Sequence, residues 1–404
     1  MSISNPKKRF LILTGDAGFG HRSAAKSVAS ALEENHHGES VTWIIDPVIE
    51  RPSPMLLRKT QLDYDHTVSK YQEWYRFTYD ISDSRPASSF VEGALTMLLY
   101  RNMQQIIAEF KPDAVLTTLH LFNAPLGSLI YTQRKNIPFF TVVTDLADVH
   151  ALWFQASPDH FFVASEAVRA QALNCNIPDK KITVSGIPVN PNLAKTPHEK
   201  ALTRRMLGLE PDRPTLLFVG SRRVNGILEC LETLQNCSIP IQVLVAAGGD
   251  EQLFKEVSGQ SWNFPLHCEN YVQNMPDWMN CSDLLITKAG GLILSEGLAA
   301  GLPIILIDNL PGQEDGNVRF ITENQAGVRV QNEIELFTVV KAWLSNDAAA
   351  LHEIAAHSRA LGHPRSAIDI ADAIWQASLI GIPHAGLPLP QPIRWMRAHE
   401  QHLD

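Results

Sequence analysis

Short apolar runs alternate with segments of helical periodicity along the whole chain. In the first half, the runs of strand length occupy residues 10–13, 41–45, 113–118, 138–144, 161–164 and 182–185. Alanine-rich or amphipathic stretches, such as residues 23–32, lie between them. Apolar strands that alternate with helices predict a parallel, doubly wound α/β sheet, because such strands are buried on both faces.

The same pattern starts again after a proline-rich, polar segment at residues 186–200. An amphipathic segment at 202–209 precedes apolar runs at residues 215–219, 241–246, 283–287 and 303–307. Because 404 residues exceed what one hydrophobic core usually serves, we expect two Rossmann-like domains. The predicted parts are a first domain at 1–190 with an aromatic-rich helical insertion at 47–110, a second domain at 197–365, and a helix and tail at 366–404 that cross back to the first domain.

Polar residues gather around two strand ends in the stretch 284–330 of the second domain. A glycine turn, Gly290 and Gly291, follows the first of these strands. The polar residues at this turn and after the next strand are Lys288, Ser295, Glu296, Gln313, Glu314 and Asn317. Doubly wound sheets bind ligands at the carboxyl ends of their strands, and a helix amino-terminus, a carboxylate and amides together suit a sugar nucleotide. The alternative is that Lys288 and Glu296 form a solvent-exposed pair and that the loop is only a connector.

A second glycine loop, GDAGFGH at residues 15–21, follows the first predicted strand. Its glycines allow a ligand to approach the backbone, and the loop ends where a helix begins. Together with Asp46 after the second strand, it can be read as a dinucleotide fingerprint. The other interpretation depends on His21, which closes the loop at the carboxyl end of a strand and is a candidate base.

These motifs resemble those of the inverting, two-domain (GT-B) glycosyltransferases that include the monogalactosyldiacylglycerol synthases and the processive diacylglycerol glucosyltransferases. The similar strings are TKAGG, SE, GLPIIL and PGQExGN in the second domain and GxGHRSAA and TLHLFN in the first. Asp145, His150 and Trp153 have the order and spacing of the family's TDL-x3-H-x2-WF segment. The bacterial N-acetylglucosaminyltransferase of peptidoglycan synthesis is a more distant resemblance. The resemblance implies two Rossmann-like domains facing across a cleft.

The resemblance also implies an activity, namely inverting, metal-independent transfer of a hexose from a UDP-sugar to a diacylglycerol-like hydroxyl. It implies that His21 is the catalytic base and that Asp145 assists it, while the alternative for Asp145 is a cap for the helix that follows. The donor-binding residues that it implies are Val272, Gln273, Lys288, Gly290, Gly291, Glu296, Gln313, Glu314 and Asn317. Ser221 and Arg222 are further donor-binding candidates, because a hydroxyl and a cation before a helix could meet the diphosphate. The acceptor-side residues are Gly18, Gly20, His120, His150 and Trp153. The turn GSRRVNG departs from the family's glycine-richer turn, which leaves the roles of Arg222 and Arg223 open.

The net charge and the cysteine content limit the kinds of partner and metal site that the protein can have. A formal charge of −9 and a pI near 5.9 argue against nucleic acid as the main partner. Five cysteines without CxxC spacing fit a reducing compartment and exclude a cysteine-based zinc site. No DxD motif stands at a predicted strand end, so we expect neither a metal nor another cofactor beside the UDP-sugar substrate.

Membrane contact would have to be local, because no apolar segment is long enough to span a bilayer. We expect a cytoplasmic protein that is peripheral on the inner face of the membrane and acts on a lipid acceptor there. The aromatic-rich stretch from Tyr64 to Tyr100, with Arg76, Arg85 and Arg101, is the candidate interfacial patch. In the alternative interpretation, these rings fill the core of a helical insertion.

Other functions stay open at this point. A UDP-N-acetylglucosamine-type epimerase shares the architecture but has no acceptor, and a glycosyltransferase could use another acceptor. A non-catalytic sugar-nucleotide-binding module is a further alternative, since a fold does not guarantee chemistry. The sequence does not distinguish galactose, glucose and N-acetylglucosamine, and it does not give the oligomeric state.

Overall fold

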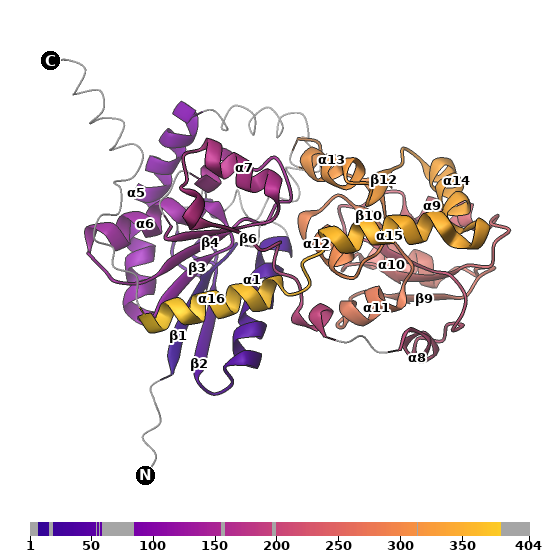
Figure 1. Cartoon of the computed structure of the whole chain (residues 1–404), viewed down its shortest axis with the longest axis horizontal. Helices are drawn as coiled ribbons and strands as arrows, with labels where there is room; N and C mark the ends of the chain where they lie inside the picture. Colours follow the sequence, from indigo (N-terminus) through magenta and orange to yellow (C-terminus); the bar gives the residue numbers. More distant parts are fainter. Residues whose placement is uncertain are drawn as a thin grey trace, which may run out of the picture. The chain divides into compact units, whose positions relative to one another are not determined.

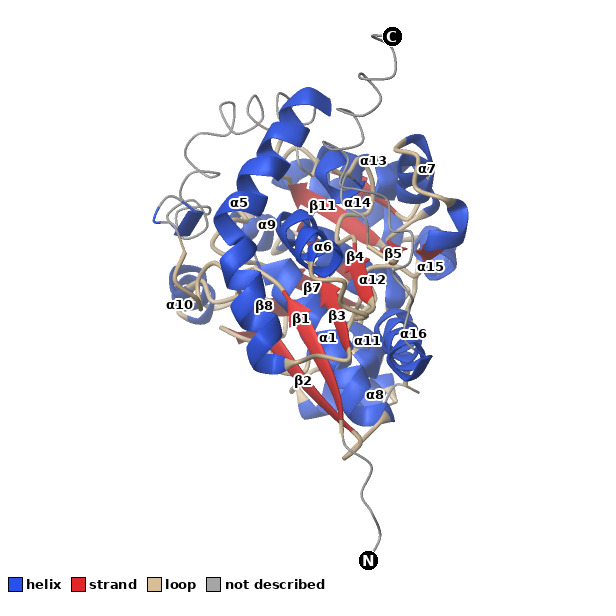
Figure 2. Ribbon diagram, turned by 90° about the vertical axis from the view of Figure 1, so that its left-hand side faces the viewer, coloured by secondary structure: helices blue, strands red, loops and turns tan. Residues whose placement is uncertain are grey.

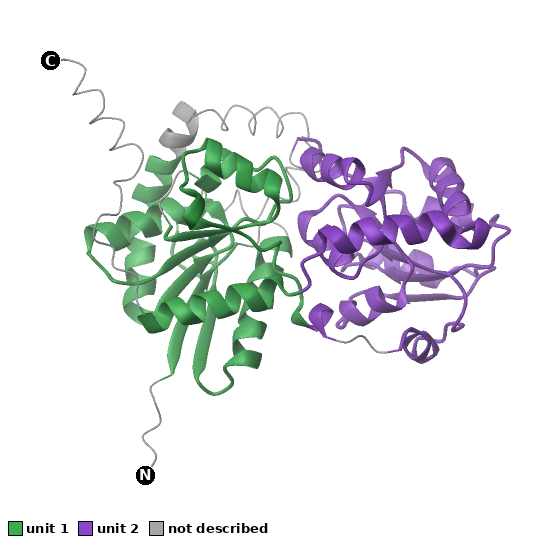
Figure 3. Cartoon of the chain, in the orientation of Figure 1, with its two compact units in different colours: residues 1–191, 365–404 green, residues 192–364 purple. Residues whose placement is uncertain are grey.

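The computed structural model describes residues 7–15, 19–53, 55, 57–58, 85–154, 158–195, 199–312 and 314–380. The chain divides into two compact units, one made of residues 1–191 and 365–404 and the other of residues 192–364 (Figure 3). In the described part of the chain, each unit contains one six-stranded parallel sheet. Helices lie between the strands in sequence and cover the sheets (Figures 1 and 2). The predicted α/β class with two doubly wound sheets is therefore confirmed.

The sheet of the first unit has the strand order β2-β1-β3-β4-β5-β6. Its strands are β1 (Lys8–Leu13), β2 (Ser40–Ile45), β3 (Ala114–Thr117), β4 (Phe139–Val142), β5 (His160–Val163) and β6 (Ile182–Val184). Its helices are α1 (Phe19–Asn35), α5 (Arg85–Phe110), α6 (Asn123–Thr132), α7 (Glu166–Asn174) and α16 (Ser366–Ile380), with short 3-10 turns η1 (His120–Phe122), η2 (Ala151–Phe154) and η3 (Asp179–Lys181).

Strand β1 shows why both faces of this sheet are covered. Phe10 and Ile12 pack into one core cluster with α1 and α16, whereas Leu11 and Leu13 pack into another with α5 and α6. All four side chains are at most 1% exposed. Successive side chains of a strand point to opposite faces, so a continuous apolar run buries the strand between two helical layers.

Helix α16 belongs to the first unit although it comes from the carboxyl-terminal end of the chain. It lies beside α1 (Figure 1), where the rings of His36 and Trp375 stack with their centroids 3.7 Å apart. The Asn35 amide donates a hydrogen bond to Asp372, and the Ser366 hydroxyl donates one to the Ile187 carbonyl. The chain therefore returns to the first sheet after it completes the second.

The sheet of the second unit has the order β12-β11-β10-β7-β8-β9. Its strands are β7 (Thr215–Val219), β8 (Gln242–Ala246), β9 (Leu266–Glu269), β10 (Leu284–Lys288), β11 (Ile304–Asp308) and β12 (Gly327–Arg329). Its helices are α8 (Lys200–Met206), α9 (Ile227–Leu234), α10 (Glu251–Ser258), α11 (Met275–Cys281), α12 (Gly291–Ala299), α13 (Asp315–Glu323), α14 (Glu333–Leu344) and α15 (Ala349–Leu361), with the 3-10 turn η5 (Asn346–Ala348). The 3-10 turn η4 (Pro191–Ala194) lies where the first unit passes into the second.

Each strand order reverses direction at one place. In the first sheet, the chain runs outward from β1 to β2 and returns to place β3 on the other side of β1. In the second sheet, it runs from β7 through β8 and β9 and returns to place β10 beside β7. Loops diverge at such a point and leave a crevice at the carboxyl ends of the strands, where doubly wound proteins bind ligands.

Most of the predicted membrane patch lies outside the described residues, including Tyr64, Arg76 and the side chain of Arg85. In the part of α5 whose side chains are described, Met97 is 86% exposed and Leu98 is also exposed. Tyr100 hydrogen-bonds to Thr132 through its hydroxyl. No helix in the described ranges has both the length and the apolar composition that a bilayer span requires.

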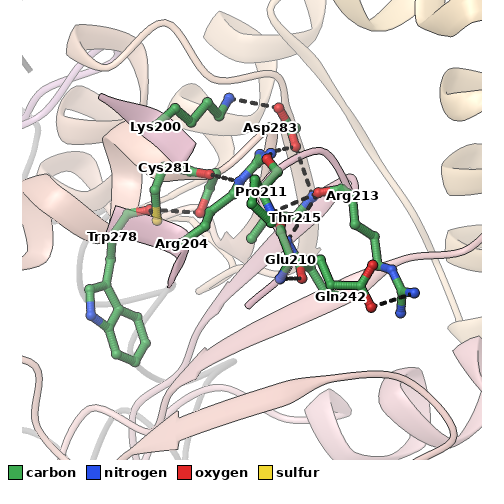
Figure 4. A network of polar contacts seen from close by, with 11 residues as sticks. Lys200, Arg204, Glu210, Pro211, Arg213, Thr215, Gln242, Trp278, Cys281 and Asp283 are labelled. Carbon is green, nitrogen blue, oxygen red and sulfur yellow. Dashed lines mark hydrogen bonds and ion pairs between the residues drawn. The ribbon is translucent and has the colours of Figure 1, made fainter. Parts of the chain in front are cut away.

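A buried ion pair holds the amino-terminal edge of the second sheet (Figure 4). The Arg204 side chain donates to Asp283 at 2.6 Å, to the Cys281 carbonyl at 2.9 Å and to the Pro211 carbonyl at 2.7 Å. The same Asp283 carboxylate accepts from the Thr215 amide and from Lys200. Since Arg204 is only 5% exposed, its charge depends on these partners.

Replacing Arg204 by Met should lower the free energy of unfolding by about 3 kcal/mol, because Asp283 and two carbonyls lose a buried donor. The measurement is urea unfolding followed by circular dichroism. Arg205 lies on the same helix with an exposed side chain, so Arg205→Met is the matched control. Equal unfolding midpoints for the two variants would contradict a supporting role for Arg204.

Candidate active site

His21 stands in the first turn of α1, directly after the glycine loop that follows β1. Its ring nitrogen Nδ1 lies 2.9 Å from the Thr118 carbonyl oxygen and 2.8 Å from the Thr144 hydroxyl oxygen. Thr118 follows β3, which lies beside β1 in the sheet, and Thr144 follows β4, which lies beside β3. The ends of three successive strands of the first sheet therefore meet at one imidazole.

The Thr118 contact determines which nitrogen of His21 carries the proton. A carbonyl oxygen can only accept a hydrogen bond, so Nδ1 must be the N–H donor. In the neutral ring, Nε2 then carries the lone pair. Burial lowers the pKa of His21 to about 4, although the hydrogen bond to Thr118 acts in the opposite direction. The ring is thus a neutral base over the physiological pH range.

Further residues that the sequence predicted for the acceptor side lie close together in the first unit. The His120 ring stacks on His150 with centroids 6.0 Å apart and meets the edge of Trp153 at 5.2 Å. Trp153 is 1% exposed, and the Leu152 amide donates to Nδ1 of His150. Gly20 lies in the first turn of α1, next to His21, whereas Gly18 lies outside the described residues.

His120 is neutral and strongly desolvated. Burial, together with smaller electrostatic effects of His150 and His21, lowers its pKa to about 3. In the described structure its Nδ1 is buried without a hydrogen-bond partner. The effect of His21 on the pKa of His120 indicates that the two rings are electrostatic neighbours.

Asp145 follows Thr144 in the loop after β4 and is half-buried. Both contacts of His21 Nδ1 are made by neutral groups, and Thr144, which makes one of them, immediately precedes Asp145. The assisting role of Asp145 stays a prediction.

Asp46 does not support the dinucleotide interpretation of the glycine loop. Its side chain is 0% exposed, and Oδ1 accepts from the backbone amides of Val48 and Ile49. A carboxylate that caps its own turn in this way does not face outward toward a ribose, so the acidic residue of the fingerprint has a structural role here.

In the second unit, the turn after β7 carries Ser221 and Arg222. The Ser221 hydroxyl accepts from the Arg223 amide, and Nε of Arg222 donates to the Gly249 carbonyl at 3.3 Å. This turn touches the end of β8, since a Cβ on Gly248 would lie 2.1 Å from the Gly220 oxygen. The turn leads into α9, whose first amides are available to an anion as at other helix amino-termini.

Lys288 and Glu314 form an ion pair at the neighbouring strand ends. The Lys288 amine contacts Oε1 of Glu314, and the backbone amide of Leu310 donates to Oε2 at 2.7 Å. A register shift at Thr287 and Lys288 interrupts the pairing of β10 with β11, and such irregularities redirect side chains at strand ends. Lys288 is therefore paired with Glu314. The alternative interpretation, in which Lys288 forms a solvent-exposed pair with Glu296, does not hold.

Glu296 is the second carboxylate that the sequence predicted for this part of the site. It lies on α12, in the helix that begins at Gly291 after the Gly290 turn. Its carboxylate has no hydrogen-bond partner among the described residues, and burial raises its pKa to about 7. A desolvated carboxylate without partners is poised to accept hydrogen bonds from a ligand, because such bonds would recover the solvation it lost.

The remaining donor-side predictions fall into three groups. Ser295 and Asn317 bond to the backbone, Ser295 to the Gly291 carbonyl and Asn317 to the Ala289 carbonyl, so both support the glycine turn. Val272 and Gln273 lie in the loop between β9 and α11, where Gln273 is exposed. Gln313 lies outside the described residues.

Comparison with known proteins identifies relatives for both units. The family described as Monogalactosyldiacylglycerol (MGDG) synthase matches residues 21–189, and the Glycosyltransferase family 28 C-terminal domain matches residues 215–368. Monogalactosyldiacylglycerol synthase 3, chloroplastic, of Arabidopsis thaliana is 29% identical over 92% of this chain and 82% of its own length. The chain is a glycosyltransferase of the monogalactosyldiacylglycerol synthase type.

Solved structures share the fold of this glycosyltransferase. Acinetobacter baumannii MurG has a TM-score of 0.56 at 16% identity, covering 92% of this chain and 100% of that chain. Anabaena Alr3699/HepE, in complex with UDP-glucose, has a TM-score of 0.54 at 11% identity, covering 91% and 98%. The family resemblance inferred from the sequence strings and the predicted GT-B fold class are both confirmed.

Sequence reasoning missed the residues that orient the predicted groups of the glycosyltransferase. Thr118 and Thr144 hold the His21 ring, and Asp308 accepts from Asn225 in the turn after β7. Their positions in the sequence could have identified them, because all three lie at or directly after the carboxyl ends of predicted strands.

Proposed function

We propose that this glycosyltransferase moves a hexose from a UDP-sugar to the hydroxyl of a diacylglycerol-like lipid, with inversion at the anomeric carbon and without a metal ion. The single observation that carries the proposal is the His21 imidazole, held neutral with its lone pair on Nε2. The names of the sequence relatives support a galactosyl donor and a diacylglycerol acceptor, and the UDP-glucose complex of a protein with this fold supports a UDP-linked donor.

In the proposed reaction, Nε2 of His21 takes the proton of the acceptor hydroxyl while that oxygen attacks the anomeric carbon. The bond from this carbon to the β-phosphate oxygen breaks, and UDP leaves with the electron pair. Attack opposite to the leaving group inverts the anomeric centre. Such a base must be unprotonated before the reaction, which its lowered pKa ensures.

The second unit would hold the donor. Glu296 would accept the two ribose hydroxyls, and the amino-termini of α9 and α12 would face the diphosphate. Arg222 and the ion pair of Lys288 with Glu314 supply charged groups at the same strand ends. Gln313 is proposed to contact the donor sugar.

The deciding experiment follows UDP release by the purified protein with UDP-galactose, UDP-glucose or UDP-N-acetylglucosamine. Each donor is tested with and without vesicles that contain diacylglycerol, and with EDTA. We expect lipid-dependent UDP release, an EDTA-resistant rate and a glycolipid detected by mass spectrometry. Donor conversion without UDP release would instead identify an epimerase, and binding without turnover would identify a binding module. Action from the cytoplasmic face of a membrane stays a separate prediction.

Replacing His21 by Ala should lower kcat by roughly 10²–10⁴-fold, because loss of a general base acts on the transition state. Calorimetry should show UDP affinity close to that of the wild type. His37 lies just beyond the end of α1 with an 86% exposed side chain, so His37→Ala is the matched control. Wild-type turnover in the His21 variant would remove this residue from the mechanism.

Replacing Glu296 by Ala should weaken UDP binding by about 1.5–3 kcal/mol. The reason is that UDP and the UDP-sugar both contain the ribose whose two hydroxyls the carboxylate would bind. Titration calorimetry with UDP measures the change, and Glu323→Ala on the exposed face of α13 is the control. Unchanged UDP affinity would show that the carboxylate has another role.

The same site predicts a pH dependence. Ribose hydroxyls bond best to an ionised carboxylate, so UDP should bind more tightly as pH rises through about 7, where Glu296 loses its proton. The difference between wild type and Glu296→Gln isolates this effect, because the titration of the phosphate is common to both. Parallel affinity curves for the two proteins would contradict the assignment.

A further inference from the structure

We propose that Thr144 is a positioning residue for catalysis, whose hydroxyl acts with the Thr118 carbonyl to keep the proton of His21 on Nδ1 and the Nε2 lone pair available. This inference rests on the proposed role of His21 as the base. It assigns to a threonine the orienting role that the sequence suggested for the neighbouring Asp145.

Position and burial support the assignment. Thr144 is 7% exposed and Thr118 is 0% exposed, so the ring meets fixed groups and not bulk water at its Nδ1 side. The two oxygens lie 2.8 Å and 2.9 Å from Nδ1. The Thr118 hydroxyl lies 3.1 Å from the His21 carbonyl oxygen and 2.9 Å from the Thr14 hydroxyl, which ties the backbone at His21 to β1 and β3.

The chemistry of the two partners explains why both are needed. If Nε2 carried the proton, the lone pair of Nδ1 would face the Thr118 carbonyl lone pairs, which is repulsive. With the proton on Nδ1, the carbonyl and the hydroxyl both accept from the same N–H. When Nε2 takes a proton from the acceptor, this N–H belongs to an imidazolium, and both bonds become charge-assisted. Thr144 therefore acts mainly on the protonated ring of the transition state.

Neutral partners give a base different from a histidine paired with a carboxylate. A carboxylate at this place would stabilise the imidazolium strongly and raise the pKa of the ring. A hydroxyl and a carbonyl stabilise it less, so burial still lowers the pKa of His21 to about 4. Titratable or charged side chains on the elements around the ring include Arg22 and Lys26 in α1, Asp46 and Glu50 after β2, His120 in η1, and Asp145, Asp148 and His150 after β4. Arg22 is paired with Glu50 at 3.0 Å.

The test compares Thr144→Val, which removes only the hydroxyl, with Thr144→Ser, which keeps it. For the valine variant we expect kcat to fall roughly ten- to hundredfold, with an unchanged KM for the donor. The serine variant should recover most of the lost activity. Both proteins should melt close to the wild type and bind UDP normally.

Two further measurements separate positioning from a merely structural role. In a His21→Ala background, Thr144→Val should cause no further loss, because the hydroxyl acts through the ring. Thr144→Asp should move the acidic limb of the pH profile of kcat/KM to higher pH, since a carboxylate there raises the pKa of His21.

The outcomes distinguish this inference from the proposed function. Wild-type activity in His21→Ala would overturn the base itself, and the inference with it. An inactive His21→Ala combined with a fully active Thr144→Val would overturn only the role of Thr144. A pH profile that moves in Asp145→Asn but not in Thr144→Asp would make the aspartate the partner, and an undiminished loss in the double variant would make Thr144 structural.

Discussion

Burial of both sheet faces is the constraint on which the rest of the structure depends. Strand β1 sends Phe10 and Ile12 to one helical layer and Leu11 and Leu13 to the other, so its interior has no place for a polar group. At β1, the polar groups of the site therefore begin where the strand ends. Parallel strands end at one edge, and this is why His21 meets threonines from two neighbouring strands and why Lys288 meets Glu314 from the next one.

The same constraint decides how much of the fold the sequence reveals. Strands such as β1, β3 and β10 each contain a continuous apolar run, and the pattern locates them within a few residues. The strands β9 (Leu266–Glu269) and β12 (Gly327–Arg329) lie at the two edges of the second sheet and have half-exposed side chains, so they lack the apolar run on which the prediction relies. Their position in the sheet depends on pairing with the neighbouring strand, and a local sequence pattern does not show this pairing.

For the candidate site, the sequence indicated residue types but not their partners. His21, Glu296 and Lys288 are recognisable because they stand beside glycine turns at strand ends. The partner of Lys288 is 26 positions away and the hydroxyl beside His21 is 123 positions away. Such pairs depend on strand register and on the direction of single side chains. Resemblance could suggest Asp145, but only coordinates could show that the preceding threonine reaches the ring.

The backbone contact between the ends of β7 and β8 limits how the second unit can change over evolution. Gly248 has a φ of 64°, and any side chain there would collide with the Gly220 oxygen, so replacing it would require both strand ends to separate. Residues 221–225 follow this contact directly, and they include Arg222, whose side chain is exposed, and Arg223, which is half-buried. The charge of this loop can therefore change by single substitutions, whereas the contact between Gly248 and Gly220 fixes the course of the backbone beside it.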